Sequence, residues 1–328
     1  MSRVSSIRWA ASLAALALAT PSLATAADPH KISEVVVVAP TPLEGRGVEA
    51  RKLPDVVETV GSDQFVRSGS LAVTDALQQH VAGLSLSDTQ GAGFTKDVDF
   101  RGFKASGLQG TPEGLAVYMD SVRLNEAFGD TVNWDLVPET AIAQANLFTS
   151  NPAFGLNALG GAVTLRMKTG FDAPGGDATL EAGSFGRIDG AVEYGATKGP
   201  WGVYVAADGG HADGWRLHSP SDVGRLYADL GWKGARSELH LILAGASTDM
   251  GAVGPTPVDL LARDRRAVFT FPQTTRNGSV LAALNGRQEL DGRWSLQGTA
   301  YLRRFNQHHL DGNDGNFAEC GGALAGFL

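Results

Sequence analysis

The sequence predicts a small α+β domain followed by about seven antiparallel β-strands of the kind that span a membrane as a barrel, here incomplete. Three observations lead to this fold class. Glycine makes up 42 of 328 residues without a Gly-X-Y period, which is typical of turn-rich β structure. Residues 56–170 combine one helical pattern with short apolar runs. From about residue 176 onward, apolar and polar residues alternate over segments of about ten residues.

The composition excludes several classes of protein. With 43% hydrophobic and 19% charged residues, the chain can bury a sizeable core and is not disordered as a whole. A formal net charge of −8 argues against nucleic acid as a partner, because such binding needs a basic face. The single cysteine, Cys320, excludes an internal disulfide framework and a cysteine-built zinc site. We expect no metal site and no cofactor.

The N-terminal segment has the pattern of a secretory signal over residues 1–26. Arg3 and Arg8 accompany an apolar stretch that is too short to cross a bilayer, and Ala24-Thr25-Ala26 fits a cleavage site. Residues 27–55 contain prolines and one isolated β-branched run, so they are expected to form a flexible arm. The sequence therefore predicts export from the cytoplasm and an extended segment ahead of the first domain.

Local signals give the order of elements within residues 56–170. Ser70 is a candidate N-cap for a helix over Leu71–His80, and Gly83 suits the helix exit. Gly160 and Gly161 permit a tight turn and close backbone approach before the last strand. Strands are expected at Gly83–Ser87, Val98–Phe103, Leu115–Tyr118, Gln144–Phe148 and Ala162–Met167.

The later segments predict strands with two unlike faces. Within residues 226–233, for example, Leu226 and Leu230 share one face while Tyr227 and Asp229 share the other. The expected strands lie near 177–185, 187–198, 200–213, 222–233, 237–248, 277–290 and 293–306. Alternation alone would also fit a soluble β-sandwich.

The connections favour a membrane barrel over a sandwich. The links after the second, fourth and sixth expected strands are short, and those after the third, fifth and seventh are long. Short turns at one rim and long loops at the other are typical of outer-membrane barrels. Trp201, Trp232 and Trp294 all adjoin the short turns, which predicts one interfacial aromatic belt.

Ordered motifs from Glu34 to about Leu217 resemble those of TonB-dependent outer-membrane receptors. The arm segment SEVVVVA resembles the TonB box of that family, and DGWRLHSP at 213–220 resembles its first long outer loop. The remaining motifs resemble signatures of the family's plug domain: DALQQHVAGLSL at 75–86, DFRGF at 99–103, LAVYMDS at 115–121, NWDLVP at 133–138 and FGLNALGGAVTLRMKT at 154–169. The resemblance implies a plug domain over 56–170 and barrel strands over 171–328.

The resemblance also implies partners and contact residues. The TonB C-terminal domain would capture Glu34, Val35, Val36, Val37, Val38 and Ala39. Such a run on a loose arm has a free edge for strand addition. Ligand would meet three outward plug loops, at 88–97, 105–113 and 125–130. The implied ligand contacts are Gln90, Phe94, Leu108, Gln109 and Phe128.

Arg101 resembles a family arginine that helps hold the plug to the barrel wall. Because it is charged and ends a predicted strand, we expect it to find a carboxylate partner. The chain also departs from the family at Thr149-Ser150-Asn151-Pro152, where an Arg-Gly-Pro is usual. One of the usual charged contacts between plug and barrel is therefore expected to be missing.

The function implied by the resemblance is uptake of a scarce ligand, with a ferric siderophore as the first candidate, by plug rearrangement coupled to the proton-motive force. The protein would lie in the outer membrane, in contact with its lipid, with plug and arm facing the periplasm. Plugged transporters use ~22 strands, so about seven strands cannot enclose a plug, and we expect this sequence to be an N-terminal fragment.

Two other functions are alternatives to uptake. One is a soluble periplasmic plug-like binding module from a degenerate, non-transporting gene. The other is a secreted β-rich enzyme, but the sequence contains no G-x-S-x-G, H-E-x-x-H or P-loop pattern. The sequence therefore favours a protein that is not an enzyme.

Overall fold

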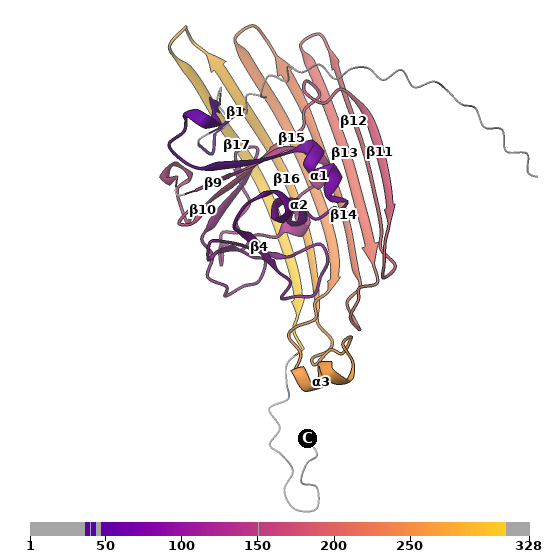
Figure 1. The fold of residues 1–328 in the computed structure, drawn as a ribbon. Helices are drawn as coiled ribbons and strands as arrows, with labels where there is room; N and C mark the ends of the chain where they lie inside the picture. Colours follow the sequence, from indigo (N-terminus) through magenta and orange to yellow (C-terminus); the bar gives the residue numbers. More distant parts are fainter. Residues whose placement is uncertain (1–36, 40, 44–46, 150, 313–328) are drawn as a thin grey trace, which may run out of the picture. The chain divides into compact units, whose positions relative to one another are not determined.

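Seven long strands form one antiparallel sheet in sequence order (Figure 1). The computed structural model describes residues 37–39, 41–43, 47–149 and 151–312. The strands of this sheet, called the wall, are β11 (Gly175–Ala182), β12 (Ile188–Lys198), β13 (Trp201–Ala212), β14 (Ser221–Lys233), β15 (Ser237–Gly251), β16 (Thr274–Glu289) and β17 (Ser295–Leu310). Within the described residues β11 and β17 do not pair with each other, so the wall is an open sheet.

The predicted strands and the alternation of their links are confirmed. Short links follow β12, β14 and β16, while longer loops follow β13 and β15. The long link predicted after the seventh strand lies beyond Leu310, mostly outside the described residues. The loop after β15 holds a short helix that was not predicted, α3 (Val258–Arg263), and Figure 1 shows it beyond one end of the strands. β16 and β17 extend further than expected, because their pairing continues to Thr274 opposite Leu310.

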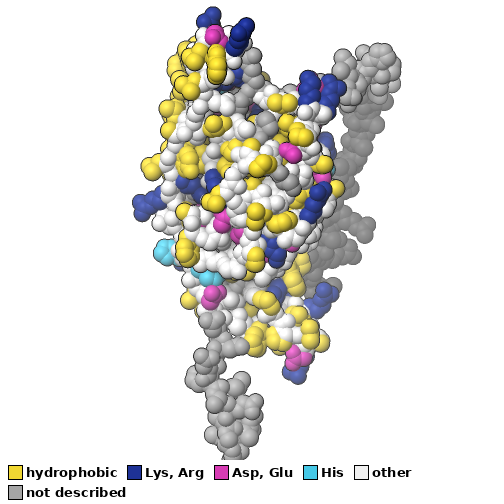
Figure 2. Space-filling view, turned by 90° about the vertical axis from the view of Figure 1, so that its left-hand side faces the viewer, with side chains coloured by type: hydrophobic (Ala, Val, Ile, Leu, Met, Phe, Trp, Pro, Cys, Tyr) yellow, Lys and Arg dark blue, Asp and Glu magenta, His cyan; other side chains and the backbone are white. Residues whose placement is uncertain are grey.

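The two faces of the wall have the reverse polarity of a water-soluble sheet. On β14, Leu226 and Leu230 are 62% and 42% exposed, whereas Tyr227 and Asp229 on the opposite face are each 2% exposed. Figure 2 shows hydrophobic side chains spread over one side of the molecule, with basic side chains at its upper end and along both edges. The outer face of the wall thus suits an apolar surrounding, and its inner face is covered by protein.

Residues 57–167 form two smaller sheets and two helices against the wall. The five-stranded sheet has the order β3-β9-β10-β7-β8, in which β10 runs parallel to β7 and antiparallel to β9. Its strands are β3 (Val57–Gly61), β7 (Leu115–Met119), β8 (Val122–Arg123), β9 (Ile142–Phe148) and β10 (Gly161–Met167). The second sheet joins β4 (Leu84–Ser87), β5 (Asp97–Phe100) and β6 (Phe103–Ala105).

The helices and short turns connect these strands. They are α1 (Ser62–Ser68), α2 (Val73–His80), η2 (Trp134–Leu136), η3 (Glu139–Ala141) and η4 (Pro152–Phe154). Ahead of them, β1 (Val37–Val38) pairs with β2 (Val48–Glu49), which leads into η1 (Ala50–Lys52). None of the helices in the described ranges is both long and apolar enough to traverse a bilayer.

One hydrophobic core joins the small domain to the wall. It contains Val117 and Trp134 from the domain together with Tyr227, Ile242 and Leu281 from the wall strands. Fully burying a large apolar side chain contributes about 1.5–3 kcal/mol. The wall is therefore part of what stabilises the domain in this structure.

Helix α2 begins two residues later than predicted. The predicted N-cap is wrong, because Ala72 is the N-cap and no side chain caps the helix. Ser70 lies just ahead of it, where its Oγ accepts the N–H of Ala72 (3.2 Å) and donates to Asp75 in the first turn (2.8 Å). Leu71 instead packs into a small cluster with Phe94 and wall residues. Strand β3 and helix α1 were not predicted. The turn between them is fixed by the Gln64 side chain, which accepts the N–H of Gly61 (2.8 Å).

The tight turn predicted at Gly160 and Gly161 is present. The N–H of Gly160 donates to the carbonyl of Gly114 (2.9 Å), and the Phe103 ring occupies the space that a Cβ at Gly160 would need. Asn151, in the segment that departs from Arg-Gly-Pro, accepts the N–H of Ala153 (3.0 Å) and starts η4. The predicted signal over 1–26 lies outside the described residues.

Candidate functional site

A buried arginine crosses from the wall to the small domain. Arg225 of β14 is fully buried and pairs with Asp208 of β13, with 2.5 Å between Nε and Oδ1. Its two other nitrogens donate to the carbonyl oxygens of Val137 and Leu71 in the domain, each at 2.8 Å. One side chain therefore connects two wall strands to two separate segments of the domain.

A second polar contact is made by a residue of the domain that binds two strands of the wall. Asp135 of η2 is buried, and its Oδ2 accepts Thr248 Oγ1 (2.8 Å) and Asn277 Nδ2 (2.9 Å) from β15 and β16. Burial raises the pKa of the Asp135 carboxyl, and the hydrogen bonds from Asn277 and Thr248 partly oppose this shift. The domain and the wall are thus joined by polar groups that are satisfied only when the two are in contact.

The hairpin between β7 and β8 makes a third contact. Asp120 has a positive φ of 42° at its tip, and its carboxylate accepts the Met167 N–H and the Tyr227 hydroxyl, each at 2.9 Å. Asn285 of β16 donates to the Asp120 carbonyl (2.9 Å). Burial raises the pKa of Asp120 to about 6. This hairpin therefore anchors the domain to β14 and β16.

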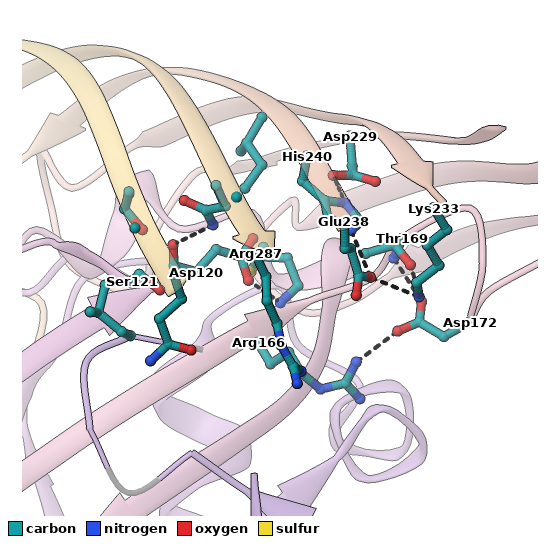
Figure 3. Close-up of a pocket in the computed structure, with 18 residues that line it drawn as sticks. Asp120, Ser121, Arg166, Thr169, Asp172, Asp229, Lys233, Glu238, His240 and Arg287 are labelled. Carbon is teal, nitrogen blue, oxygen red and sulfur yellow. Dashed lines mark hydrogen bonds and ion pairs between the residues drawn. The ribbon is translucent and has the colours of Figure 1, made fainter. Parts of the chain in front are cut away.

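A hollow of about 230 Å³ lies beside this hairpin (Figure 3). Figure 3 shows charged side chains converging on it from the domain and the wall. On the wall side, His240 lies between Asp229 (2.8 Å) and Glu238 (3.2 Å), and Glu238 also pairs with Lys233 (2.8 Å). The charges alternate in sign, so the hollow is balanced rather than strongly acidic or basic.

The pH dependence of stability is expected to include a contribution from Glu139 in η3. Burial raises the pKa of this carboxyl to about 7 from 4.5, so the folded state favours the protonated form. Ionisation therefore costs the folded state as pH rises from 4.5 through 7, and this carboxyl alone should lower the unfolding free energy by about 3 kcal/mol between pH 4 and 8. Chemical denaturation of the protein and of Glu139→Gln measures this contribution as the difference between their two slopes, because Asp120, whose pKa is also raised, remains in the variant. An unchanged slope in the variant would contradict the assignment, and the exposed Asp63→Asn serves as control.

A larger open hollow of about 1030 Å³ lies between the domain and β17. Two of the predicted ligand residues, Gln109 and Phe128, line it, and Phe128 is 80% exposed. Arg303 of β17 forms its floor by donating to the Leu124 carbonyl (2.9 Å) and to Glu126 (2.5 Å). The further lining includes Arg123, Tyr301 and Phe305. The hollow thus combines aromatic faces with two arginines that are each paired with a carboxylate, Arg303 with Glu126 and Arg123 with Asp130 (2.9 Å).

The other predicted ligand residues are placed differently. Phe94 is 2% exposed and packs with Leu71 and Val223 beneath the Arg187 guanidinium, 5.5 Å from the ring centroid. Gln90 is half-buried, and its carbonyl accepts the N–H of Val253 (2.7 Å). Leu108 is also half-buried and its N–H donates to Ser106 (3.0 Å). The five residues do not share one pocket, and their role in binding ligand stays a prediction.

The predicted TonB box is partly described. Val37 and Val38 form β1, which pairs with β2, and Val38 is buried in a cluster with Tyr118, Phe148 and Phe154. Ala39 follows directly, whereas residues 34–36 lie outside the described residues. The binding of TonB by these residues stays a prediction.

Arg101 does not find the carboxylate partner expected of it within the described part of the chain. Its φ is 54° in the turn between β5 and β6, and its side chain is exposed, with the guanidinium 4.9 Å from the Phe100 ring centroid. Water solvates an exposed arginine, so no carboxylate is needed. Its predicted role in holding the plug to the barrel stays a prediction, and Arg225 makes such a contact from the wall.

Sequence reasoning missed the charged residues on the inner face of the wall. Arg225 and Arg303 fall on the polar face of their alternating strands, with Tyr227 and Tyr301 respectively. A lone arginine on such a face was the available signal, since a buried charge needs partners across the interface. Asp135 lies within the NWDLVP motif at 133–138, but nothing near it in the sequence indicates that Thr248 and Asn277 are its partners.

Comparison with known proteins identifies the class. Residues 49–162 match the family model of the TonB-dependent receptor plug domain. No curated protein matches the sequence. Among solved structures, the open form of the ferric-catecholate import receptor Fiu from E. coli K12 is 15% identical, with a TM-score of 0.64, over 78% of this chain and 39% of that one.

Two further structures have the same fold. Unliganded ferric citrate transporter FecA is 12% identical with a TM-score of 0.67, over 80% of this chain and 41% of that one. The pyoverdine outer-membrane receptor FpvA from Pseudomonas aeruginosa PAO1, bound to pyoverdine, is 13% identical with a TM-score of 0.67, over 80% of this chain and 39% of that one. The chain thus spans about two fifths of the length of these structures.

These findings confirm the plug domain recognised from the motifs. The chain contains a TonB-dependent receptor plug domain, and its seven wall strands have the fold of the N-terminal part of such a receptor's barrel.

Proposed function

We propose that this chain is the plug and first barrel strands of an outer-membrane receptor that takes up a scarce ligand by TonB-driven plug rearrangement. The observation that carries the proposal is the plug's attachment to the polar inner face of a wall whose outer face is apolar. The polar contacts that hold the plug there include those of Arg225, Asp135 and Asp120. An enzymatic function has no comparable support, because the family is one of receptors and transporters.

We place the wall in the outer membrane, with its short turns toward the periplasm. Exposed Leu226 and Leu230 would face lipid, where their burial is favourable. Trp201 and Trp232 are partners across β13 and β14 beside the short turns, as an interfacial belt requires. The soluble plug-like module is less well supported, because it gives no reason for an apolar outer face.

A ferric siderophore is the ligand we propose. The relatives named above are described as receptors or transporters for ferric catecholates, ferric citrate and pyoverdine. In this chain, the hollow around Phe128 offers the aromatic faces of Phe128, Tyr301 and Phe305, on which aromatic groups of such a complex can stack. Deleting the gene in the native host should abolish growth on one ferric siderophore under iron limitation. Equal growth of mutant and parent on every siderophore supplied would exclude this ligand class.

The arm is expected to bind TonB directly. A synthetic peptide of residues 31–42 should bind the TonB C-terminal domain, because its β-branched run can add a strand to the partner's sheet. Val36→Pro in the same peptide should weaken binding about tenfold or more, since proline removes a backbone donor and cannot continue a ladder. Isothermal titration calorimetry measures both, and Ser33→Ala is the control. Equal affinities for the native and Val36→Pro peptides would show that no strand is added.

A further inference from the structure

We infer that Arg216 is a positioning residue that couples an outer loop of the wall to the plug loop carrying Gln90. Arg216 lies in the loop between β13 and β14. Its guanidinium reaches across to the loop between β15 and β16, at residues 252–273, which we call the long loop. Nη1 donates to the Gly254 carbonyl (3.1 Å) and at 3.5 Å to that of Val253. Nη2 donates to the Ala267 carbonyl (2.8 Å) and to Thr256 Oγ1.

These acceptors lie at two places that are distant along the long loop. Val253 and Gly254 directly follow β15, while Ala267 comes after α3. One planar guanidinium therefore closes the loop on itself. Nearby contacts strengthen the junction, since the Leu217 N–H donates to the Arg266 carbonyl (2.9 Å) and the His218 ring stacks on Phe271 at 3.8 Å between centroids.

The coupling then passes from the long loop to the plug through one residue. Val253 is buried, and its carbonyl accepts from Arg216 while its N–H donates to the Gln90 carbonyl at 2.7 Å. Its side chain lies against Gly91, where a Cβ would overlap Val253 Cγ2. Gly91 also has a φ of +65°, a conformation that glycine adopts without strain. Val253 is thus fixed on one side by the wall and on the other by the plug.

The geometry requires an arginine rather than any cation. Four acceptors surround the guanidinium, and a fork of fixed N–H groups can meet several of them in one plane. The ammonium of lysine is a point charge with three rotatable donors on a flexible stem, so it holds fewer of these acceptors in place. Arg216→Lys therefore keeps the positive charge but loses the fixed arrangement of N–H donors that matches the four acceptors.

The purpose of this coupling rests on the proposed function. Gln90 belongs to a plug loop expected to meet ligand, so Arg216 would set the position of that loop before ligand arrives. Movement of the outer loops on ligand binding would reach the plug by the same route. The coupling itself is independent of any ligand and can be measured without one.

Hydrogen exchange of the full chain in detergent micelles, read by mass spectrometry, tests the inference. Arg216→Lys should raise the exchange rate about fivefold both in peptides of the long loop and in the plug peptide spanning 88–97. A peptide of the plug core at Gly161–Met167 should be unchanged. Arg266→Lys is the matched control, because the exposed Arg266 contributes only its carbonyl to the junction.

A second variant tests the coupling from the plug side. Gly91→Ala should push Val253 away and raise exchange at 252–256, although Arg216 itself is intact. This variant also covers the case in which Arg216→Lys does not fold. Faster exchange confined to the long loop in Arg216→Lys, or spread equally over the plug core, would overturn the inference. The exchange experiment contains neither ligand nor TonB, so a negative result would contradict the coupling but not the proposed uptake. A negative growth experiment would contradict uptake but not the coupling.

Discussion

Replacing Arg225 by methionine is expected to lower the free energy of unfolding by about 3–5 kcal/mol and to loosen the plug from the wall. The side chain is fully buried, so its removal leaves the equally buried Asp208 without its charge partner. The carbonyls of Val137 and Leu71 lose their donor at the same time. Chemical denaturation measures the stability, and limited proteolysis reports the plug, whose segments around residues 71 and 137 should become cleavable.

Two further variants separate a buried charge from a general loss of packing. Arg276→Met removes an exposed arginine that pairs with Asp249 at 2.8 Å, and it should cost less than about 1 kcal/mol. The double variant Arg225→Met with Asp208→Leu should recover most of the loss in stability, because no uncompensated charge remains buried. A double variant as unstable as the single one would show that the plug carbonyls, not the ion pair, dominate.

The sequence predicted the wall well because its signal is local. Each strand has period-2 alternation, and each pair is joined by its own turn, so seven strands follow from neighbours in the chain. The beginning of β16 was harder to predict, because Thr274 and Thr275 are strand residues through their pairing with β15 and β17, which no local pattern reports. Helix α3 was missed since it carries no buried face in this structure.

The site was less predictable because its contacts join segments far apart in sequence. Asp135 Oδ2 accepts from Thr248 and Asn277, and Arg225 donates to Leu71, at separations that no local pattern reports. Phe94 illustrates the same limit. An aromatic residue in an outward plug loop indicates a ligand contact, yet here the wall covers its ring. Family motifs place such loops in order along the chain, but packing decides which side chains stay exposed.

Gly161→Ala is expected to destabilise the plug by about 3–5 kcal/mol, from backbone strain and overlap together. Gly161 begins β10 with a φ of +150°, and a Cβ there would overlap the carbonyl oxygen of Phe148 on β9. That oxygen belongs to backbone paired with Ala162, so it cannot rotate away as a side chain would. Since β10 lies between β9 and β7, any shift disturbs both neighbours.

The matched control for Gly161→Ala is Gly110→Ala, which isolates the cost of backbone conformation. Gly110 has a φ of +83° and nothing within 4 Å of an added Cβ, so only strain of about 1–2 kcal/mol is expected. Chemical denaturation of both variants gives the difference. If the two variants lose equal free energy of unfolding, the overlap with Phe148 is relieved at no cost, and Gly161 is needed only for its backbone conformation. A larger loss at Gly161 would mean that close approach of β9 and β10 is what the Gly-Gly pair of the plug motif provides.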